Sequence, residues 1–212
     1  AIFSRACYLM EAVLEEKENR TMEILVTSVS ANQLMVGKII GILGVGLTQL
    51  VAWGVFIALG IVIGRSFFEP LRYVSVSPGL IGIALWVMLP CFVMLSGLMA
   101  AVGATVTEAR EGQQISGLIS LPVWLPYFLI AVIMEHPNSP LTIGLSLFPI
   151  TAPLTIILRM GFTVIPAWQI ALSFVLQVLA AIGALWLAGR AFRLGMLMYG
   201  KKLAWRALFA RR

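Results

Sequence analysis

The sequence has little charge and few residues suited to covalent or metal chemistry. Of its 212 residues, 11% are charged and 60% are hydrophobic, with one histidine and two cysteines. An average soluble domain carries about a quarter charged residues, so a soluble fold could not bury this much apolar surface. The single histidine excludes a histidine-rich metal centre, and Cys7 and Cys91 lie too far apart in the sequence to suggest a disulfide framework or metal site. The composition predicts an integral membrane protein.

Signatures of energy coupling are also missing from the sequence. There is no GxxxxGK[ST] loop, so the chain does not hydrolyse nucleotide by that route. None of the predicted spans carries an aspartate, glutamate, lysine, arginine or histidine in its interior, which disfavours a self-contained proton-driven carrier. If this chain takes part in energised transport, another subunit must supply the energy.

Long uncharged runs predict transmembrane helices, since about 20 residues are needed to cross the hydrocarbon core. Four runs fit, at about residues 39–63, 79–106, 115–134 and 168–188. A charged turn over residues 107–114 separates the second run from the third. Two small-xxx-small pairs in the first run favour close helix packing over a specific dimer seam. They are Gly37/Gly41 and Gly60/Gly64.

Residues 141–160 are long enough to cross, but Pro149 and Pro153 interrupt them and predict two short helices in a hairpin. With a hairpin, 12 of the 15 basic residues fall on one side of the membrane, and the exterior side holds Arg65, Arg72 and Arg159. A fifth crossing would move the seven basic residues of the tail to the other side, against the positive-inside tendency. We therefore expect a re-entrant or interfacial hairpin outside, and both ends of the chain in the cytoplasm.

Residues 1–38 precede the first full span. Residues 1–10 read as the end of an earlier span, so we expect the chain to begin inside a longer protein. Residues 11–25 then carry a helical pattern of apolar and charged positions. Up to Lys38 there are five glutamates and four basic residues, so anionic lipid would attract this block weakly. The block suits docking in a protein groove, with a solvated connection as the alternative.

A second function class shares one motif with this block. Glu15, Glu16 and Arg20 spell EExxxR, the first motif of intramembrane proteases that resemble the CAAX-processing family, where a glutamate and histidine partners activate water. That family also needs FxxxH and a further histidine motif, but Val132 stands four residues before His136. We place His136 in an exterior turn. A CAAX-protease-like protease and a non-catalytic membrane assembly protein are the alternative functions.

The end of the chain, residues 191–212, forms a basic cytoplasmic tail. From Gly189 onward there are seven basic residues and no acidic ones, with apolar residues between them. This composition favours a juxtamembrane helix on anionic lipid. No motif supports nucleic-acid binding.

Several segments resemble a known family. EEKENRTMEILVTSVSANQLMVGKIIG and GVGLTQLVAW are followed in order by TEAREGQQISGLISLP, LFPITAPLTIILRM and FRLGMLMYGKK. Together they resemble type 2 ABC exporter permeases, in particular the Nat-type sodium-efflux permease. The resemblance implies an all-α integral membrane protein with a cytoplasmic coupling helix, a helical bundle of four full spans over residues 39–190 and a re-entrant exterior hairpin.

The resemblance also implies function and partners. The chain would be a permease subunit without enzymatic activity or cofactor, exporting a substrate such as sodium across a prokaryotic plasma membrane. It would pair with a second permease copy or a related chain, and with ATP-binding subunits that hold ATP and magnesium. The family has an earlier span and often an exterior domain, so without them this chain alone is expected not to transport.

The resemblance assigns two cytoplasmic contacts. The ATPase would bind the coupling helix through a set of mostly charged residues. They are Glu15, Glu16, Lys17, Glu18, Asn19, Arg20 and Glu23. A second contact is expected at Glu108, Arg110 and Glu111. No catalytic residue and no metal ligand is expected.

Overall fold

The computed structural model describes residues 7, 10–11, 31–64, 66–67, 78–106 and 108–196, which are helical apart from short turns and contain no strand. They include seven helices, from six to 34 residues long. These are α3 (Ala31–Gly64), α5 (Pro78–Thr105), α6 (Ala109–Phe128), α7 (Ile130–Glu135), α8 (Pro140–Leu147), α9 (Ala152–Met160) and α10 (Ala167–Met196). The predicted all-α class is confirmed for this part of the chain.

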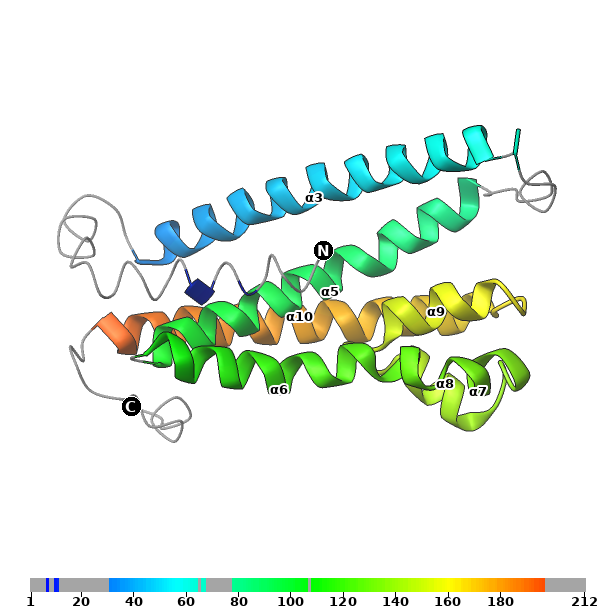
Figure 1. Ribbon diagram of the computed structural model, residues 1–212. Coiled ribbons are helices and arrows are strands. Elements are labelled where there is room, and N and C mark those ends of the chain that lie inside the picture. The colour runs from blue at the N-terminus through cyan, green and yellow to red at the C-terminus, as the bar shows by residue number, and fades with distance from the viewer. Residues whose placement is uncertain are drawn as a thin grey trace.

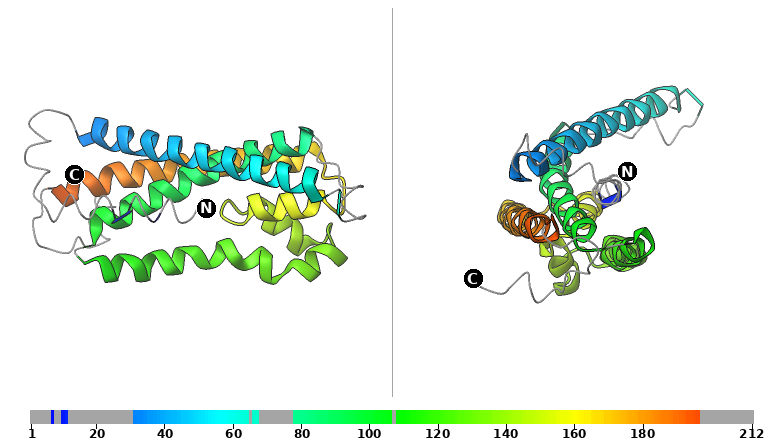
Figure 2. Two further views of the ribbon diagram at one scale, coloured as in Figure 1. Left: turned by 45° about the horizontal axis from the view of Figure 1, so that its top comes forward. Right: turned by 90° about the vertical axis from the view of Figure 1, so that its left-hand side faces the viewer.

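Four long helices, α3, α5, α6 and α10, lie lengthwise beside one another (Figures 1 and 2). One end of the bundle gathers the start of α3, the end of α5, the start of α6 and the end of α10, and we call it the 106–108 end. The opposite end carries α7, α8 and α9, and we call it the hairpin end. Because α6 leads to the hairpin end and α10 leads back from it, the segment between them starts and finishes at that end.

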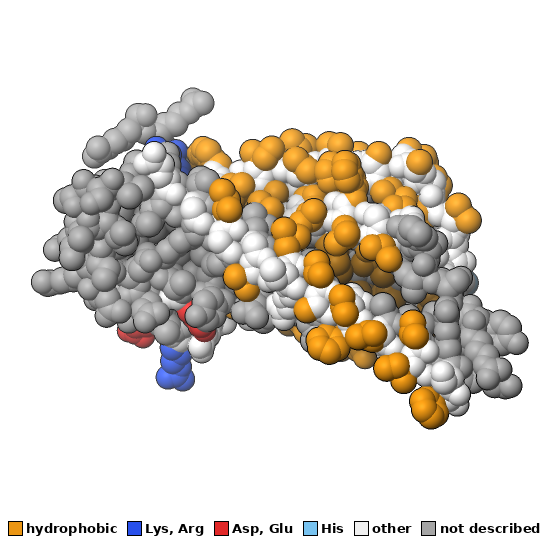
Figure 3. Space-filling model, turned by 90° about the horizontal axis from the view of Figure 1, so that it is seen from above, with side chains coloured by type: hydrophobic (Ala, Val, Ile, Leu, Met, Phe, Trp, Pro, Cys, Tyr) orange, Lys and Arg blue, Asp and Glu red, His pale blue; other side chains and the backbone are white. Residues whose placement is uncertain are grey.

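Two of these helices meet the length and composition needed to cross a membrane. The stretches are Ile81–Thr105 in α5 and Ala167–Ala191 in α10, and α3 contains a shorter apolar stretch, Gly44–Phe56. Apolar side chains cover much of the described surface seen in Figure 3, whereas charged ones lie toward the 106–108 end. This distribution fits a membrane protein. The full set of four spans stays a prediction.

The structure shows a helix over most of the predicted turn at residues 107–114, which corrects that prediction, and a helix break within the predicted span over residues 115–134. Helix α6 already begins at Ala109, after Glu108 in an extended conformation (φ −128°, ψ 138°). The polar stretch that was predicted as a loop turn is therefore mostly helical. The negative charge of Glu111, in the first turn of α6, stabilises the N-terminus of the helix. The helix then ends at Phe128, and Leu129 (φ −96°, ψ 15°) separates it from α7. Two prolines four residues apart weaken the backbone hydrogen bonds just before this point.

The two short helices predicted between residues 141 and 160 are present as α8 and α9. The turn that joins them reaches the apolar core of the bundle, where Ile150 packs against a cluster that includes Cys91 and Met94 of α5. Thr151 satisfies the end of α8, since its hydroxyl donates to the carbonyl oxygen of Leu145 at 2.6 Å. Irregular backbone inside an apolar bundle is tolerated where such groups find partners within the protein.

Helices α5 and α10 form the most extensive helix pair. A β-carbon at Gly97 would lie 3.0 Å from the backbone carbonyl carbon of Ala184, so the two backbones nearly touch. Eleven residues earlier on α5, Trp86 stacks on Phe174, ten residues earlier on α10, with ring centroids 4.3 Å apart. The helices therefore run in the same direction. We call their line of small buried residues the small-residue seam: Gly97, Ala100, Ala101, Ala104, Ala181, Ala184, Ala188 and Ala191.

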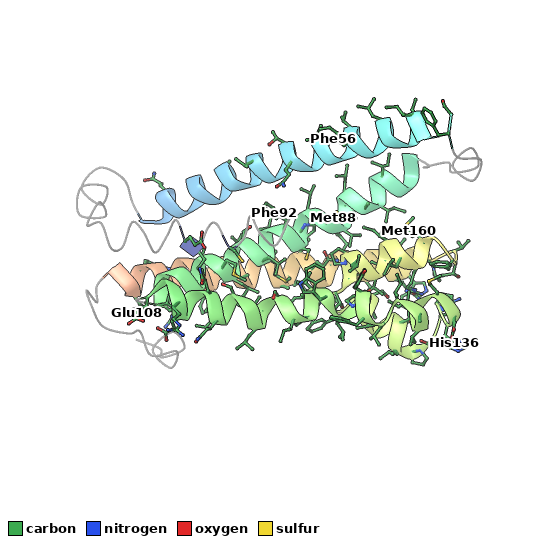
Figure 4. All side chains as sticks on the ribbon, in the orientation of Figure 1. Phe56, Met88, Phe92, Glu108, His136 and Met160 are labelled. Atoms are coloured by element: carbon green, nitrogen blue, oxygen red, sulfur yellow. The ribbon has the colours of Figure 1, made fainter. Side chains whose placement is uncertain are left out.

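Three of the four glycines in the α3 pairs do not make the close packing that their spacing suggests. Among the described residues, no atom of another element lies within 4 Å of a β-carbon at Gly37, Gly41 or Gly60. The close approach of α3 is at Gly46, whose β-carbon would come 2.7 Å from the ring of Phe92 on α5 (Figure 4). Spacing alone did not reveal which glycine faces a neighbour.

Met10, near the start of the chain, also packs into the core. Met10 is buried in the same apolar cluster as Met94 and Met99 of α5. The hydroxyl of Ser116 on α6 approaches its sulfur at 3.0 Å. A β-carbon at Gly112 would lie 3.0 Å from that sulfur, so α6 accommodates the methionine by having no side chain there.

Candidate functional site

The predicted ATPase contact lies outside the described residues, because Glu15 to Glu23 fall between the described Glu11 and Ala31. Both flanking positions lie at the 106–108 end. Ala31 begins α3 there, and Met10, next to Glu11, packs on Gly112 near the start of α6. The role of the seven predicted contact residues therefore stays a prediction, while the described chain enters and leaves this block at one end of the bundle.

The second predicted contact lies at that same end. Glu108 and Arg110 are exposed, and Glu111 is half-buried in the first turn of α6. The carbonyl oxygen of Glu108 accepts a hydrogen bond from the backbone N–H of Gly112 at 3.2 Å, and Figure 4 shows Glu108 at the tip of the bundle. Exposed charges of both signs beside the ends of α5 and α10 form a surface able to bind a charged protein partner.

His136 lies at the hairpin end, in a turn after α7 (Figure 4), and the exterior location of this turn stays a prediction. Its side chain is exposed, and its backbone is used structurally: its N–H donates to Val132 and its carbonyl oxygen accepts from the Thr142 hydroxyl at 3.1 Å. The protease alternative requires glutamate and histidine to meet at one water molecule. Its glutamates, Glu15 and Glu16, lie outside the described residues, so this alternative is argued against only by the missing histidine motifs of the sequence.

The largest fully buried side chain among the described residues belongs to an arginine. The sequence analysis counted it only as an exterior charge. Arg159 of α9 is 0% exposed. Its Nε donates to the carbonyl oxygen of Pro137 at 2.8 Å, its Nη1 to the hydroxyl of Ser146 at 2.8 Å, and its Nη2 to Oδ1 of Asn138 at 3.2 Å. Burial lowers the pKa of the guanidinium, although arginine stays protonated in folded proteins. A full positive charge is thus held by three neutral oxygens.

A wider hydrogen-bond network surrounds this arginine. Nδ2 of Asn138 donates to the hydroxyl of Thr163 at 3.3 Å, and the N–H of Thr163 donates to the carbonyl oxygen of Arg159 at 2.9 Å. The hydroxyl of Ser139 accepts from the backbone N–H of Thr142 at the start of α8. The signal available in the sequence was one arginine in an apolar stretch rich in threonine and serine, but its partners stand 13 to 22 positions away.

Uncharged polar side chains also line the inner face of α10. Gln169, Ser173 and Gln177 are all buried at four-residue spacing, and Nε2 of Gln177 donates to the hydroxyl of Ser173 at 3.2 Å. Among the described residues, Oε1 of Gln169 and of Gln177 accept no hydrogen bond. The hydrogen bond between Gln177 and Ser173 stays within α10 and does not join it to another helix.

The described residues include no group of three or more histidine, cysteine or acidic side chains that could hold a metal ion. Cys91 is buried and Cys7 half-buried, and both are free thiols.

The family model for ABC-2 family transporter proteins matches residues 1–190. Two curated relatives align over nearly the whole chain. The uncharacterized protein MJ1024 of Methanocaldococcus jannaschii is 32% identical over 203 residues, which cover 96% of this chain and 48% of that protein. The uncharacterized protein YhaP of Bacillus subtilis is 26% identical over 217 residues, which cover 98% of this chain and 51% of that protein. The chain spans about half the length of these relatives. No solved structure matches it significantly.

Proposed function

The chain belongs to the ABC-2 transporter family, and on that premise we propose that it is a membrane permease subunit of an ABC exporter. In this proposal a partner subunit hydrolyses ATP, and this chain carries the resulting movement to a path across the membrane. Substrate leaves the cell by that path. The chain itself provides no catalytic residue.

The observation that carries the proposal is the difference between the two ends of the bundle. The 106–108 end gathers the flanks of the charged opening block, the exposed Glu108 and Arg110, and the last turns of α10. An ATP-binding subunit on this side would contact several helix ends at once, so its closure would move more than one helix. The hairpin end is formed by the short helices α7, α8 and α9, and its exposed polar residues include Glu135 and His136.

The proposed membrane topology has four crossings, by α3, α5, α6 and α10, with α8 and α9 as a re-entrant hairpin on the exterior side. The helix directions support an even number of crossings between the start of α3 and the end of α10. Basic positions support the orientation, since Arg110, Arg190 and Arg193 lie near the 106–108 end. That end would face the cytoplasm of a prokaryotic cell, and relatives from an archaeon and a bacterium agree with this setting.

The proposed partners are an ATP-binding subunit and a second permease copy or related chain. The ATPase would dock on the coupling helix at Glu15, Glu16, Lys17, Glu18, Asn19, Arg20 and Glu23. Glu108, Arg110 and Glu111 would make the second contact, and the basic tail would lie on anionic lipid. Sodium, suggested by the Nat-type resemblance, is the first cargo to test.

The test begins with the complex formed by the full permease and its ATP-binding subunit. We expect co-purification of the two subunits, and ATP-driven transport in proteoliposomes that is assayed first with radioactive sodium and then with a panel of hydrophobic cations and peptides. The double variant Glu16→Lys with Arg20→Glu places opposite charges at the docking face. We expect it to release the ATPase and abolish transport.

The matched control is Glu135→Lys, which reverses one exposed glutamate at the hairpin end. It should keep the ATPase bound. Unchanged ATPase binding and ATP-driven transport in the double variant would refute the coupling role of the opening block. A wild-type complex without ATP-driven transport of any cargo in the panel would refute the permease function.

A further inference from the structure

The buried charge of Arg159 needs an explanation beyond fold stability. Its three bonds all go to neutral oxygens, and no carboxylate of the described residues pairs with it. Taking a guanidinium out of water is costly, and replacing a buried charged group with a well-packed apolar one is often neutral or stabilising. A methionine of similar length could fill this space. An apolar side chain, however, makes no directional hydrogen bonds, so it could not hold three separate segments in fixed relative positions.

The guanidinium joins three parts of the chain that are separate in the sequence. Its donors lie in one rigid plane, so three simultaneous bonds fix the positions of their acceptors. Pro137 and Asn138 belong to the turn between α7 and α8, Ser146 belongs to α8, and Arg159 itself to α9. We call residues 136–163 the hairpin unit. The bond from Asn138 to Thr163 extends the unit to the turn after α9.

The attachment of the hairpin unit to the long helices is of another kind. Ala152 and Ile156 of α9 pack with Val87 of α5, while Ile165 and Ile170 complete the cluster from the side of α10. These contacts are apolar and have no preferred direction, so packed helices can slide by small amounts across them. The hairpin unit is therefore tied within itself by directional bonds and to its surroundings by contacts that permit sliding.

We propose that Arg159 is a positioning residue for opening the exterior side of the permease. It holds α8, α9 and the preceding turn as one rigid unit, so that the unit shifts as a whole over α5 and α10 when substrate leaves. The path then opens between the hairpin unit and the long helices, and α8 does not separate from α9. This role depends on the proposed function as a transporter.

The test combines a rigidity measurement that needs no transport with a transport measurement. Amide hydrogen exchange of residues 139–148 is followed in the full permease complex for wild type, Arg159→Met and Arg159→Lys. We expect Arg159→Met to exchange roughly ten-fold faster in this segment, with residues 170–185 of α10 unchanged. Arg159→Lys keeps the charge but can reach fewer of the three acceptors, so its exchange should be intermediate.

The same proteins are then assayed in proteoliposomes. We expect Arg159→Met to lower the turnover number of transport about ten-fold with the same half-saturating substrate concentration, because in this proposal Arg159 acts on substrate release and not on substrate binding. ATP hydrolysis should continue, since the ATPase lies at the other end. A milder pair guards against misfolding. Ser146→Ala removes one acceptor, and Ser120→Ala removes an exposed hydroxyl that bonds within α6, so only the first should raise exchange in residues 139–148.

Unchanged exchange in both Arg159→Met and Ser146→Ala would overturn the role of Arg159, whatever the transport result. Faster exchange with an unchanged turnover number would overturn it as well, because rigidity would then not matter for release. A wild-type complex that transports nothing would instead overturn the proposed function, and with it the role in opening.

Discussion

The hairpin unit and the small-residue seam hold the bundle together by different means. In the hairpin unit, a buried guanidinium and several hydroxyls make hydrogen bonds between 2.6 and 3.3 Å long. In the seam, Gly97 and Ala184 bring two backbones into direct contact, and no charged group takes part. The first is a short, irregular structure. The second joins two helices of 28 and 30 residues.

The difference follows from what each region must satisfy. Short helices leave many carbonyl and N–H groups without partners, so residues 136–163 need side chains that supply them. Long helices satisfy the hydrogen bonds of their own backbone. In an apolar medium they are held together mainly by van der Waals packing, and small residues allow the two backbones to approach closely. Substitutions in the seam should therefore lower stability by steric overlap, and those in the hairpin unit should lower it by removing hydrogen bonds.

The largest effect is expected from Gly97→Leu in the seam. The new side chain would begin 3.0 Å from the backbone of Ala184, so the two helices must move apart along their contact. We expect a loss of about 3 kcal/mol in the free energy of unfolding, measured by denaturant titration in micelles. The matched control is Gly82→Leu in the same helix, where no atom lies within 4 Å of the added β-carbon. Equal losses in the two variants would refute the seam as a close contact.

The next effect is expected in the hairpin unit, from Thr151→Val. This change keeps the shape of the side chain but removes the hydroxyl that bonds to Leu145 in a buried position. Leaving that carbonyl unsatisfied should cost about 2 kcal/mol of unfolding free energy. The control, Thr48→Val, removes an exposed hydroxyl that bonds to Val45 within α3 and should cost less than about 0.5 kcal/mol. A similar, small loss in both would show that the buried bond contributes little.

A smaller effect is expected outside both regions, at the stacked rings of Trp86 on α5 and Phe174 on α10. A double-mutant cycle to alanine should give a coupling energy of about 1 kcal/mol in the same titration. The comparison cycle uses Tyr127 and Phe128, whose rings meet edge-on at 6.4 Å and are exposed. Their coupling should be about half as large or less. If the two cycles agree, the stacked pair adds nothing specific to the contact between α5 and α10.

The smallest effect is expected from Ser116→Ala, which tests how much the contact with Met10 stabilises the core. The change removes a hydroxyl 3.0 Å from the sulfur of Met10 and 2.8 Å from the carbonyl oxygen of Gly112. We expect a loss of about 0.5 to 1 kcal/mol, because the carbonyl keeps its helical partner. Ser120→Ala, one turn later and less buried, should lose less. A larger loss in Ser120→Ala would contradict this packing.

Local sequence features predicted the elements but not how they contact one another. Prolines at 149 and 153 indicated two short helices, and α8 and α9 are there. The charged stretch at 107–114 was read as a turn because its residues are polar, yet six of those positions begin α6. Polarity and helix propensity are separate properties, and arginine, glutamate and glutamine form helices well. A hydropathy pattern therefore gave the apolar part of the helix and missed its polar start.

The sequence by itself determined that the chain is apolar, helical and made of long helices with one interrupted segment, since length, hydropathy and proline act within a few neighbouring residues. Only the tertiary structure decided that Gly97 and not the glycine pairs of α3 brings two helices together. It also decided that Arg159 is a buried centre and not an exterior charge. Both features depend on segments far apart in the chain. A charge is stable when buried only where the fold brings enough hydrogen-bond acceptors around it.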